Sequence, residues 1–178
     1  MKKTKNKKSI NNSYVFIDAT NIIYGASRLG WKVDFQKLFK YLKERYKANK
    51  IFYFAGVDDE NKKQLKFYEK LSEFGYLLRL IPVKRFSDGS RKADVDSRMT
   101  FEIMLNFPNY NCAVVMTGDG DFYWVLDYLV SKKQKIYLMS QGKSTARELK
   151  KLFGKEYTDV FRIKNLLEFK QKKRGRRF

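Results

Sequence analysis

The feature that most constrains the fold is the alternation of short apolar runs with longer segments of helical periodicity. The apolar runs, which we expect to be buried strands, lie at residues 14–18, 51–57, 76–83, 112–117, 135–139 and 157–163. The helical segments lie at residues 35–46, 61–74, 93–106 and 122–131, with a last helix after Ser144. Strands separated by helices predict an α/β fold, in which a mostly parallel central sheet is flanked by helices on both faces.

The length of the chain fits one such domain, with a basic segment at each end. We expect the domain to span residues 13–169 of the 178, since no internal repeat divides them. Residues 1–12 and 170–178 are rich in lysine and arginine, and they predict flexible tails.

The charge of the chain indicates a phosphate-rich partner. Its 39 lysines and arginines against 19 acidic residues give a net charge of +20. Such an excess attracts polyanions and speeds their capture, which favours a nucleic acid, either RNA or DNA, as the partner. A chain that is merely kept soluble by lysine is the alternative interpretation.

Two absences narrow the chemistry. Cys112 is the only cysteine, so no disulfide can form within the chain and a cysteine-rich zinc site is excluded. Histidine is absent, which removes Ser-His and Cys-His nucleophiles and histidine-ligated zinc. No apolar stretch is long enough to span a membrane, and the run that ends at Asp18 is too short for a signal peptide. We therefore expect a cytoplasmic protein with no membrane partner.

Acidic side chains follow the predicted strands at the edge where ligands of such sheets bind. Asp18 ends the first strand, Asp119 and Asp121 lie in the glycine-rich turn after the central strand, and Asp94 and Asp96 begin a helix. Carboxylates brought this close repel one another unless a cation lies among them. Oxygen ligands without histidine or cysteine prefer Mg²⁺ or Mn²⁺, so the sequence predicts a site for one of these ions.

Each acid also has a purely structural interpretation. An aspartate before a helix often only caps it, and Asp121 is the best such candidate. Asp94 and Asp96 are about 200° apart on a helix, so both cannot face one ion, and we favour Asp96. Glu102 lies about 240° round from Asp96 and is expected to support the helix or a neighbouring basic group.

Other polar and aromatic residues are candidates for contact with a nucleic acid. Lys92, Lys143 and Ser144 could contact the phosphate backbone, although Lys92 could also be only solvated and Ser144 could only cap a helix. Tyr24, Arg28 and Trp31 follow Asp18 and could stack on unpaired bases, with packing as the alternative.

Several motifs in this order resemble the NYN domain, a branch of the PIN-like nuclease fold, and its LabA-like subgroup in particular. They are Phe-Ile-Asp-Ala-Thr-Asn at 16–21, Lys-Ala-Asp-Val-Asp at 92–96, Thr-Gly-Asp-Gly-Asp-Phe at 117–122, Ser144 with Leu149, and Thr-Asp-Val-Phe at 158–161. The resemblance implies a three-layer PIN-like, Rossmann-like fold.

The resemblance also implies a function, a metal-dependent ribonuclease. Its acids would be Asp18, Asp96, Asp119 and Asp121, with Asn21 ordering the site. An inactive or weakly active RNA-binding regulatory module is the first alternative. A phosphatase or phosphotransferase of another α/β fold is the second, and Thr20 counts against it, because one such pattern requires an aspartate two residues after the first.

Overall fold

The centre of the molecule is a six-stranded parallel sheet in the order β3-β2-β1-β6-β7-β8. The computed structural model describes residues 12–171. The strands are β1 Ser13–Asp18, β2 Ala48–Val57, β3 Leu77–Pro82, β6 Cys112–Met116, β7 Lys135–Ser140 and β8 Tyr157–Asp159. β1 is paired in parallel with both β2 and β6, so the strand order reverses between β1 and β6.

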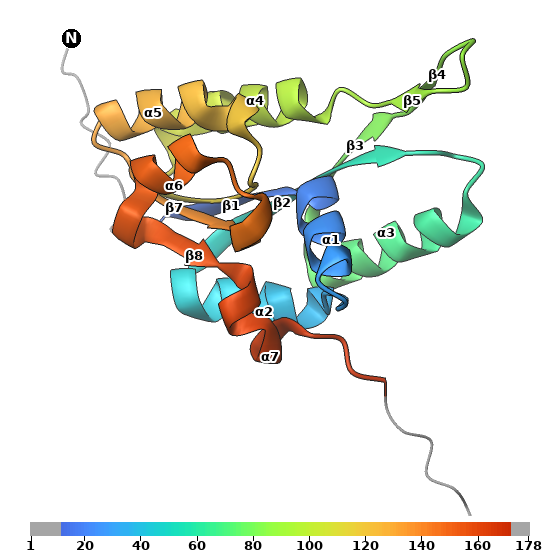
Figure 1. The fold of residues 1–178 in the computed structure, drawn as a ribbon, viewed down its shortest axis with the longest axis horizontal. Helices are drawn as coiled ribbons and strands as arrows, with labels where there is room; N and C mark the ends of the chain where they lie inside the picture. The colour runs from blue at the N-terminus through green and yellow to red at the C-terminus, as the bar shows by residue number, and fades with distance from the viewer. Residues whose placement is uncertain (1–11, 172–178) are drawn as a thin grey trace, which may run out of the picture.

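Helices cover both faces of this sheet, which makes three layers (Figure 1). On one face lie α1 Ala19–Arg28, α2 Phe35–Tyr46, α3 Lys62–Phe74 and α7 Lys164–Leu167. On the other face lie α4 Val95–Leu105, α5 Tyr123–Ser131 and α6 Arg147–Phe153. The predicted fold class is confirmed.

Side chains of the central strands alternate between two buried cores. Val15 and Ile17 point into the core shared with α1, α2 and α3, whereas Tyr14 and Phe16 point into the core shared with α4 and α5. Because both faces of β1 are covered, all six of its residues are buried. This explains why the strand is a continuous apolar run rather than an alternating one.

The structure departs from the sequence prediction in three places. Helix α1 begins directly after Asp18, where no helix was expected. The polar connection at 87–92 is part of an antiparallel hairpin. It contains the turn and the second strand, β5 Arg91–Lys92, which pairs with β4 Lys84–Arg85, and the hairpin projects from the body in Figure 1. The last strand stops at Asp159, because Val160–Ile163 forms a short 3-10 helix capped by that aspartate.

The two predicted basic tails fall largely outside the described residues, which exclude 1–11 and 172–178. Among the helices of residues 12–171, none is long and apolar enough to cross a membrane.

Candidate metal centre

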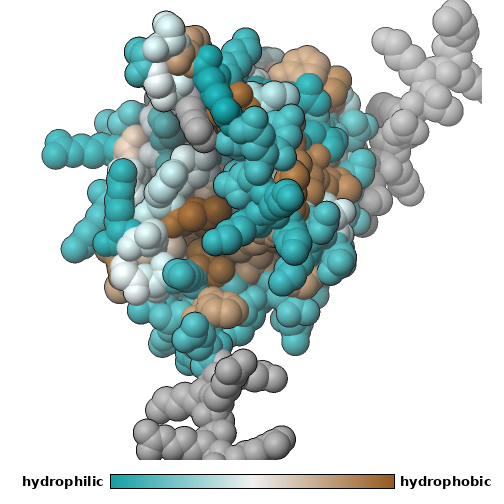
Figure 2. All heavy atoms as spheres, turned by 90° about the vertical axis from the view of Figure 1, so that its right-hand side faces the viewer, coloured by the Kyte–Doolittle hydropathy of each residue, from teal (hydrophilic) through white to brown (hydrophobic). Residues whose placement is uncertain are grey.

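The site lies at the carboxyl ends of β1 and β6, where the strand order reverses and where ligands bind in open parallel sheets. A cavity of about 300 Å³ opens there. It is lined by Asp18, Thr20, Asn21, Tyr24, Gly25, Arg28, Ala93, Val95, Asp96, Asp119 and Ser144. The face of the molecule on this side is largely hydrophilic, with hydrophobic side chains gathered in small areas (Figure 2).

Asp18 lines the cavity and is 4% exposed. One carboxylate oxygen accepts a hydrogen bond from the backbone N–H of Asn21 at 3.1 Å, so Asp18 also caps α1. The other accepts from the hydroxyl of Thr117 at 3.1 Å, across the β1–β6 pair. Burial raises the pKa of Asp18 from 3.8 to about 6, against the lowering effect of these two donors. The charges of Asp96 and Asp119 raise it further.

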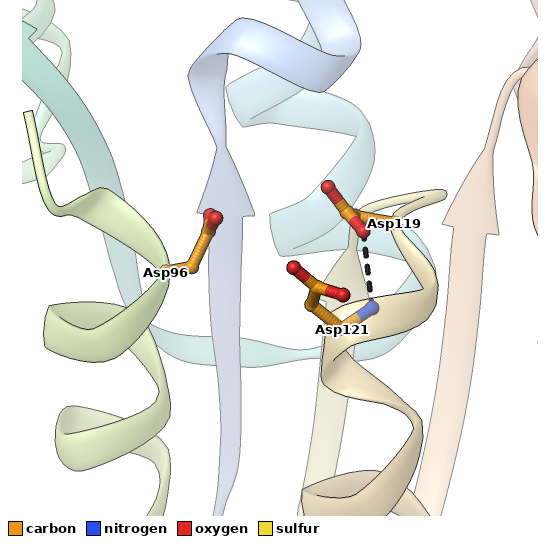
Figure 3. A group of neighbouring side chains, drawn as sticks. All are labelled: Asp96, Asp119 and Asp121. Carbon is orange, nitrogen blue, oxygen red and sulfur yellow. Dashed lines mark hydrogen bonds between the residues drawn. The ribbon is translucent and has the colours of Figure 1, made fainter. Parts of the chain in front are cut away.

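Three other carboxylates lie close together at the site. Asp96, Asp119 and Asp121 each offer an oxygen, and these oxygens lie within 4.8 Å of one another. Figure 3 shows them facing each other, Asp96 from α4 and the other two from the turn before α5. Burial raises the pKa of Asp96, and the charges of Asp119 and Asp121 raise it further, so the three acids repel one another when ionised.

The turn after β6 fixes two of these acids. Asp119 accepts a hydrogen bond from the backbone N–H of Asp121 at 3.0 Å, so Asp119 caps the 3-10 helix Gly120–Phe122, and the expectation that Asp121 is the cap is wrong. Gly118 donates its N–H to Oδ1 of Asn21 at 2.9 Å. A Cβ atom on Gly118 would lie 3.2 Å from that oxygen and from Cα of Thr145, so this close approach favours glycine.

The start of α4 separates the two neighbouring aspartates. Asp94 occupies the N-cap position without a side-chain cap bond and lines a different hollow with Arg98. Asp96 lies in the first turn and faces the other two acids. Glu102 is buried away from the site and pairs with Arg79 and Arg98, both at 2.8 Å, which confirms its expected supporting role.

The three residues proposed for phosphate contact differ in position. Lys92 is exposed, and its charge lowers the pKa of Asp96, although burial and the neighbouring acids raise that pKa overall. Ser144 lines the acidic cavity, but its hydroxyl donates to the carbonyl of Gln141 at 3.2 Å and caps no helix, so the capping alternative is wrong. Lys143 is exposed and lines a separate hollow, so the structure does not bring it to the acidic cavity.

The three residues proposed for base stacking also divide. Tyr24 is 60% exposed and lines the acidic cavity, as does Arg28. Trp31 is 4% exposed and packs in the core with α1 and α2, so the expectation that it stacks on a base is wrong.

Thr117 is the site residue that sequence reasoning missed. It is fully buried, donates to Asp18, and accepts from the backbone N–H of Asp119 at 3.2 Å. Its signal was a polar residue completing an apolar strand, which needs a buried partner in the same way as Asp18.

Comparison with known proteins decides the family. The family model described as the NYN domain matches residues 12–160, which includes β1, the hairpin, α4 and the acidic turn. The chain belongs to the NYN domain family. It therefore falls within the PIN-like nuclease superfamily, and the predicted resemblance is confirmed.

Two relatives are similar to this NYN domain over most of their length. One is the low amplitude and bright protein LabA of Synechococcus elongatus, 26% identical over 162 residues that cover 86% of each chain. The other is a crystal structure of a protein of unknown function from Vibrio parahaemolyticus, with a TM-score of 0.71 and 19% identity. The match covers 80% of this chain and 88% of the Vibrio chain, and it supports the fold alone.

The donor set of this NYN domain suits a hard divalent cation. All three clustered ligands are carboxylate oxygens, which suit Mg²⁺ or Mn²⁺ better than softer metals. Asp18 lines the same cavity as Asp96 and Asp119. Both of its carboxylate oxygens already accept hydrogen bonds, one from Asn21 and one from Thr117. The cluster thus consists of three acids. Asp18 is a fourth, buried acid outside the cluster, and its charge adds to the negative potential there.

Proposed function

We propose that this protein is a metal-dependent ribonuclease that hydrolyses RNA phosphodiester bonds at the acidic cavity. The observation that carries the proposal is the cluster of Asp96, Asp119 and Asp121 oxygens within 4.8 Å, set at the strand-order reversal of a chain with a net charge of +20. Membership of the PIN-like nuclease superfamily supports it.

Mg²⁺ or Mn²⁺ would be held by Asp96, Asp119 and Asp121. Asp18, which lines the same cavity, would add negative charge to the site. When bound, the ion supplies an acidified water as nucleophile and offsets charge on the phosphate oxygens. Without a cation, an RNA phosphate approaching this cluster would meet acids that already repel one another. The requirement for a divalent cation follows from this repulsion.

The protein's own hydrogen bonds keep the site in place. Thr117 bonds to both Asp18 and the backbone of Asp119, so one hydroxyl links the ends of β1 and β6 into a hydrogen-bonded unit. Asn21 bonds to Gly118 through its side chain and to Asp18 through its backbone, which ties α1 to the same unit. These contacts fix the ligands of an ion before it binds.

Basic groups near the cavity would hold the RNA backbone. Lys92, whose charge acts on Asp96, and Arg28, which lines the cavity, are the candidates for this role, and Ser144 offers a hydroxyl there. Lys143 would contact RNA only beyond the cavity, because it lines a separate hollow. The domain proposed to act in this way spans residues 13–169, with the basic residues 1–12 and 170–178 adding attraction for RNA.

The decisive experiment is cleavage of labelled single-stranded RNA and DNA in Mg²⁺, Mn²⁺ or EDTA. We expect RNA cleavage that needs the metal and falls by at least about 100-fold in Asp119→Asn. Asp59→Asn is the control, because Asp59 is exposed, lies outside the cluster and gives the same change in net charge. Equal turnover by Asp119→Asn and wild-type protein would contradict the proposal. RNA binding without cleavage in any metal would instead identify a binding module.

A further inference from the structure

The outer face of α5 carries large side chains that no core contact explains. Trp124 is 78% exposed and Tyr128 is 45% exposed, whereas Leu126 and Leu129 on the opposite face are buried in the core. An indole left this open to water adds little to the stability of the fold, and exposed apolar side chains that lie next to one another mark interaction sites.

This face of α5 begins at the acidic cluster. Asp121 belongs to the 3-10 helix Gly120–Phe122, which runs directly into α5 at Tyr123. Residues three apart eclipse each other in a 3-10 helix and remain neighbours in an α-helix, so Trp124 lies on the same side as Asp121. Tyr128 follows Trp124 one helical turn later, at a rise of about 6 Å.

A cation completes the row. The ammonium group of Lys132, just after the end of α5, lies 5.1 Å from the centre of the Tyr128 ring. Asp121, Trp124, Tyr128 and Lys132 thus follow one another within a narrow sector of a single helix surface. We call the last three of these residues the α5 stripe.

We propose that the α5 stripe is a stacking track for the unpaired bases of RNA that extends away from the acidic cluster. Exposed aromatic rings followed by a cation are the combination that binds single strands, because the rings stack on bases and the cation meets the backbone. The inference rests on the proposed function in taking RNA as the ligand, and it adds positioning residues outside the cavity.

Two observations favour RNA over a second protein molecule at the stripe. A net charge of +20 opposes close association of two copies of this chain. The stripe also carries a cation beside its rings, since the ammonium group of Lys132 lies 5.1 Å from the centre of the Tyr128 ring. Such a surface matches a ligand that carries both bases and phosphates.

Tryptophan fluorescence tests this directly in EDTA, where binding is separated from cleavage. The chain has two tryptophans, and Trp31 is buried, so acrylamide quenching reports mainly on Trp124. We expect a single-stranded oligoadenylate to quench Trp124 emission and to protect it from acrylamide. A blunt RNA duplex of equal charge should do neither. Equal effects of the duplex and the single strand would overturn the stacking track.

Affinity measurements on variants provide the second test. We expect Trp124→Ala and Tyr128→Ala each to weaken oligoadenylate binding about tenfold. The slope of binding against salt and the melting temperature should stay unchanged, because neither charge nor core is altered. Phe101→Ala is the matched control, an aromatic ring of 55% exposure outside the stripe, and it should bind like wild type.

The outcomes separate this inference from the proposed function. Tenfold weaker binding by Trp124→Ala in a protein that cleaves nothing would leave the track intact and overturn the ribonuclease. Wild-type affinity of Trp124→Ala in a protein that cleaves RNA would do the reverse. A wild-type dimer in sedimentation that Trp124→Ala converts to a monomer would show that the stripe is a self-interface, and would overturn the track as well.

Discussion

At the scale of single residues, Asp18 shows how the site opposes the stability of the fold. A buried carboxylate favours its protonated form, and burial raises the pKa of Asp18 from 3.8 to about 6. Well below pH 3.8 the group is protonated in both folded and unfolded chains, so its ionisation has no cost to folding. As the pH rises through about 6, the folded protein must hold the charge, and this part of its stability is lost.

Asp18→Asn should therefore stabilise the metal-free protein. In EDTA at pH 8 we expect the free energy of unfolding to rise by about 1–3 kcal/mol, since a neutral amide replaces the buried charge. At pH 3 the gain should vanish, because Asp18 is then protonated in both the folded and the unfolded chain. Urea denaturation at the two pH values measures both, and a loss of stability of the same size at each pH would contradict the argument.

Thr117 is a positioning residue whose hydroxyl serves two partners. Thr117→Val keeps the shape and removes the hydroxyl, so the buried Asp18 loses a donor and the Asp119 N–H loses an acceptor. We expect a loss of about 1–3 kcal/mol in the free energy of unfolding and Mn²⁺ affinity lower by about 10-fold to 100-fold. Calorimetric titration with Mn²⁺ measures the affinity. Thr117→Ser should restore most of it, and failure of serine to do so would show that the methyl group matters instead.

At the scale of elements, the position of Asp96 depends on how α4 is held against the sheet. Glu102 on α4 is buried and pairs with Arg79 on β3 and Arg98 on α4. Although burial by itself raises the pKa of Glu102, the two guanidinium groups outweigh it, and the pKa lies below its ordinary value. A lowered pKa means that the pairs stabilise the fold at neutral pH and that this contribution is lost as the pH falls below 4.5 through the lowered pKa.

Glu102→Gln should accordingly destabilise the protein by about 1–3 kcal/mol at pH 7, since both arginines are partly solvated and the pairs are screened. The difference from wild type should shrink in acid. Glu44→Gln is the control, because its partner Lys40 is 3.8 Å away and both side chains are well exposed. We expect that change to lower the free energy of unfolding by less than about 0.5 kcal/mol. Thermal denaturation of both variants and of the wild type measures the two differences.

The strands could be predicted from the sequence because strands buried on both faces leave unbroken apolar runs. Helix α1 could not, since its residues include β-branched side chains and Gly25, which are poor helix formers. The helix forms because Asp18 caps it and because Ile22 and Ala26 pack into the core. The hairpin of β4 and β5 has no apolar run to reveal it, because its strands consist of lysine and arginine, and Lys84, Arg85 and Lys92 are exposed.

The acids of the candidate site could be predicted because each one ends a strand or begins a helix. Their mutual arrangement could not. Helix periodicity showed that Asp94 and Asp96 cannot both face one ion, but Thr117 joins Asp18 across 99 residues of chain, a contact that no local pattern reveals. For Trp31 the sequence left stacking and packing open, because proximity to Asp18 along the chain does not show which side chains enter the core, and the structure confirms packing.

At the scale of the whole molecule, the charge sets how strongly any nucleic acid binds. With a net charge of +20, we expect RNA affinity in EDTA to fall by at least about 100-fold between 50 and 200 mM salt. Fluorescence anisotropy of a labelled oligonucleotide measures it. An affinity that does not respond to salt would show that phosphate contacts contribute little.

The pairing of β1 with β6 also has a consequence during synthesis. β1 is the first strand to be synthesised, but it is a central strand of the finished sheet and pairs with β6, which is made much later. The cluster of Asp96, Asp119 and Asp121 can form only when residues up to Asp121 have been added. A ribosome-bound chain shorter than this carries many lysines but cannot yet assemble the three-acid cluster. The order of translation thus delays the cluster until most of the sheet exists, so a truncated product would be basic yet unable to hold the ion there.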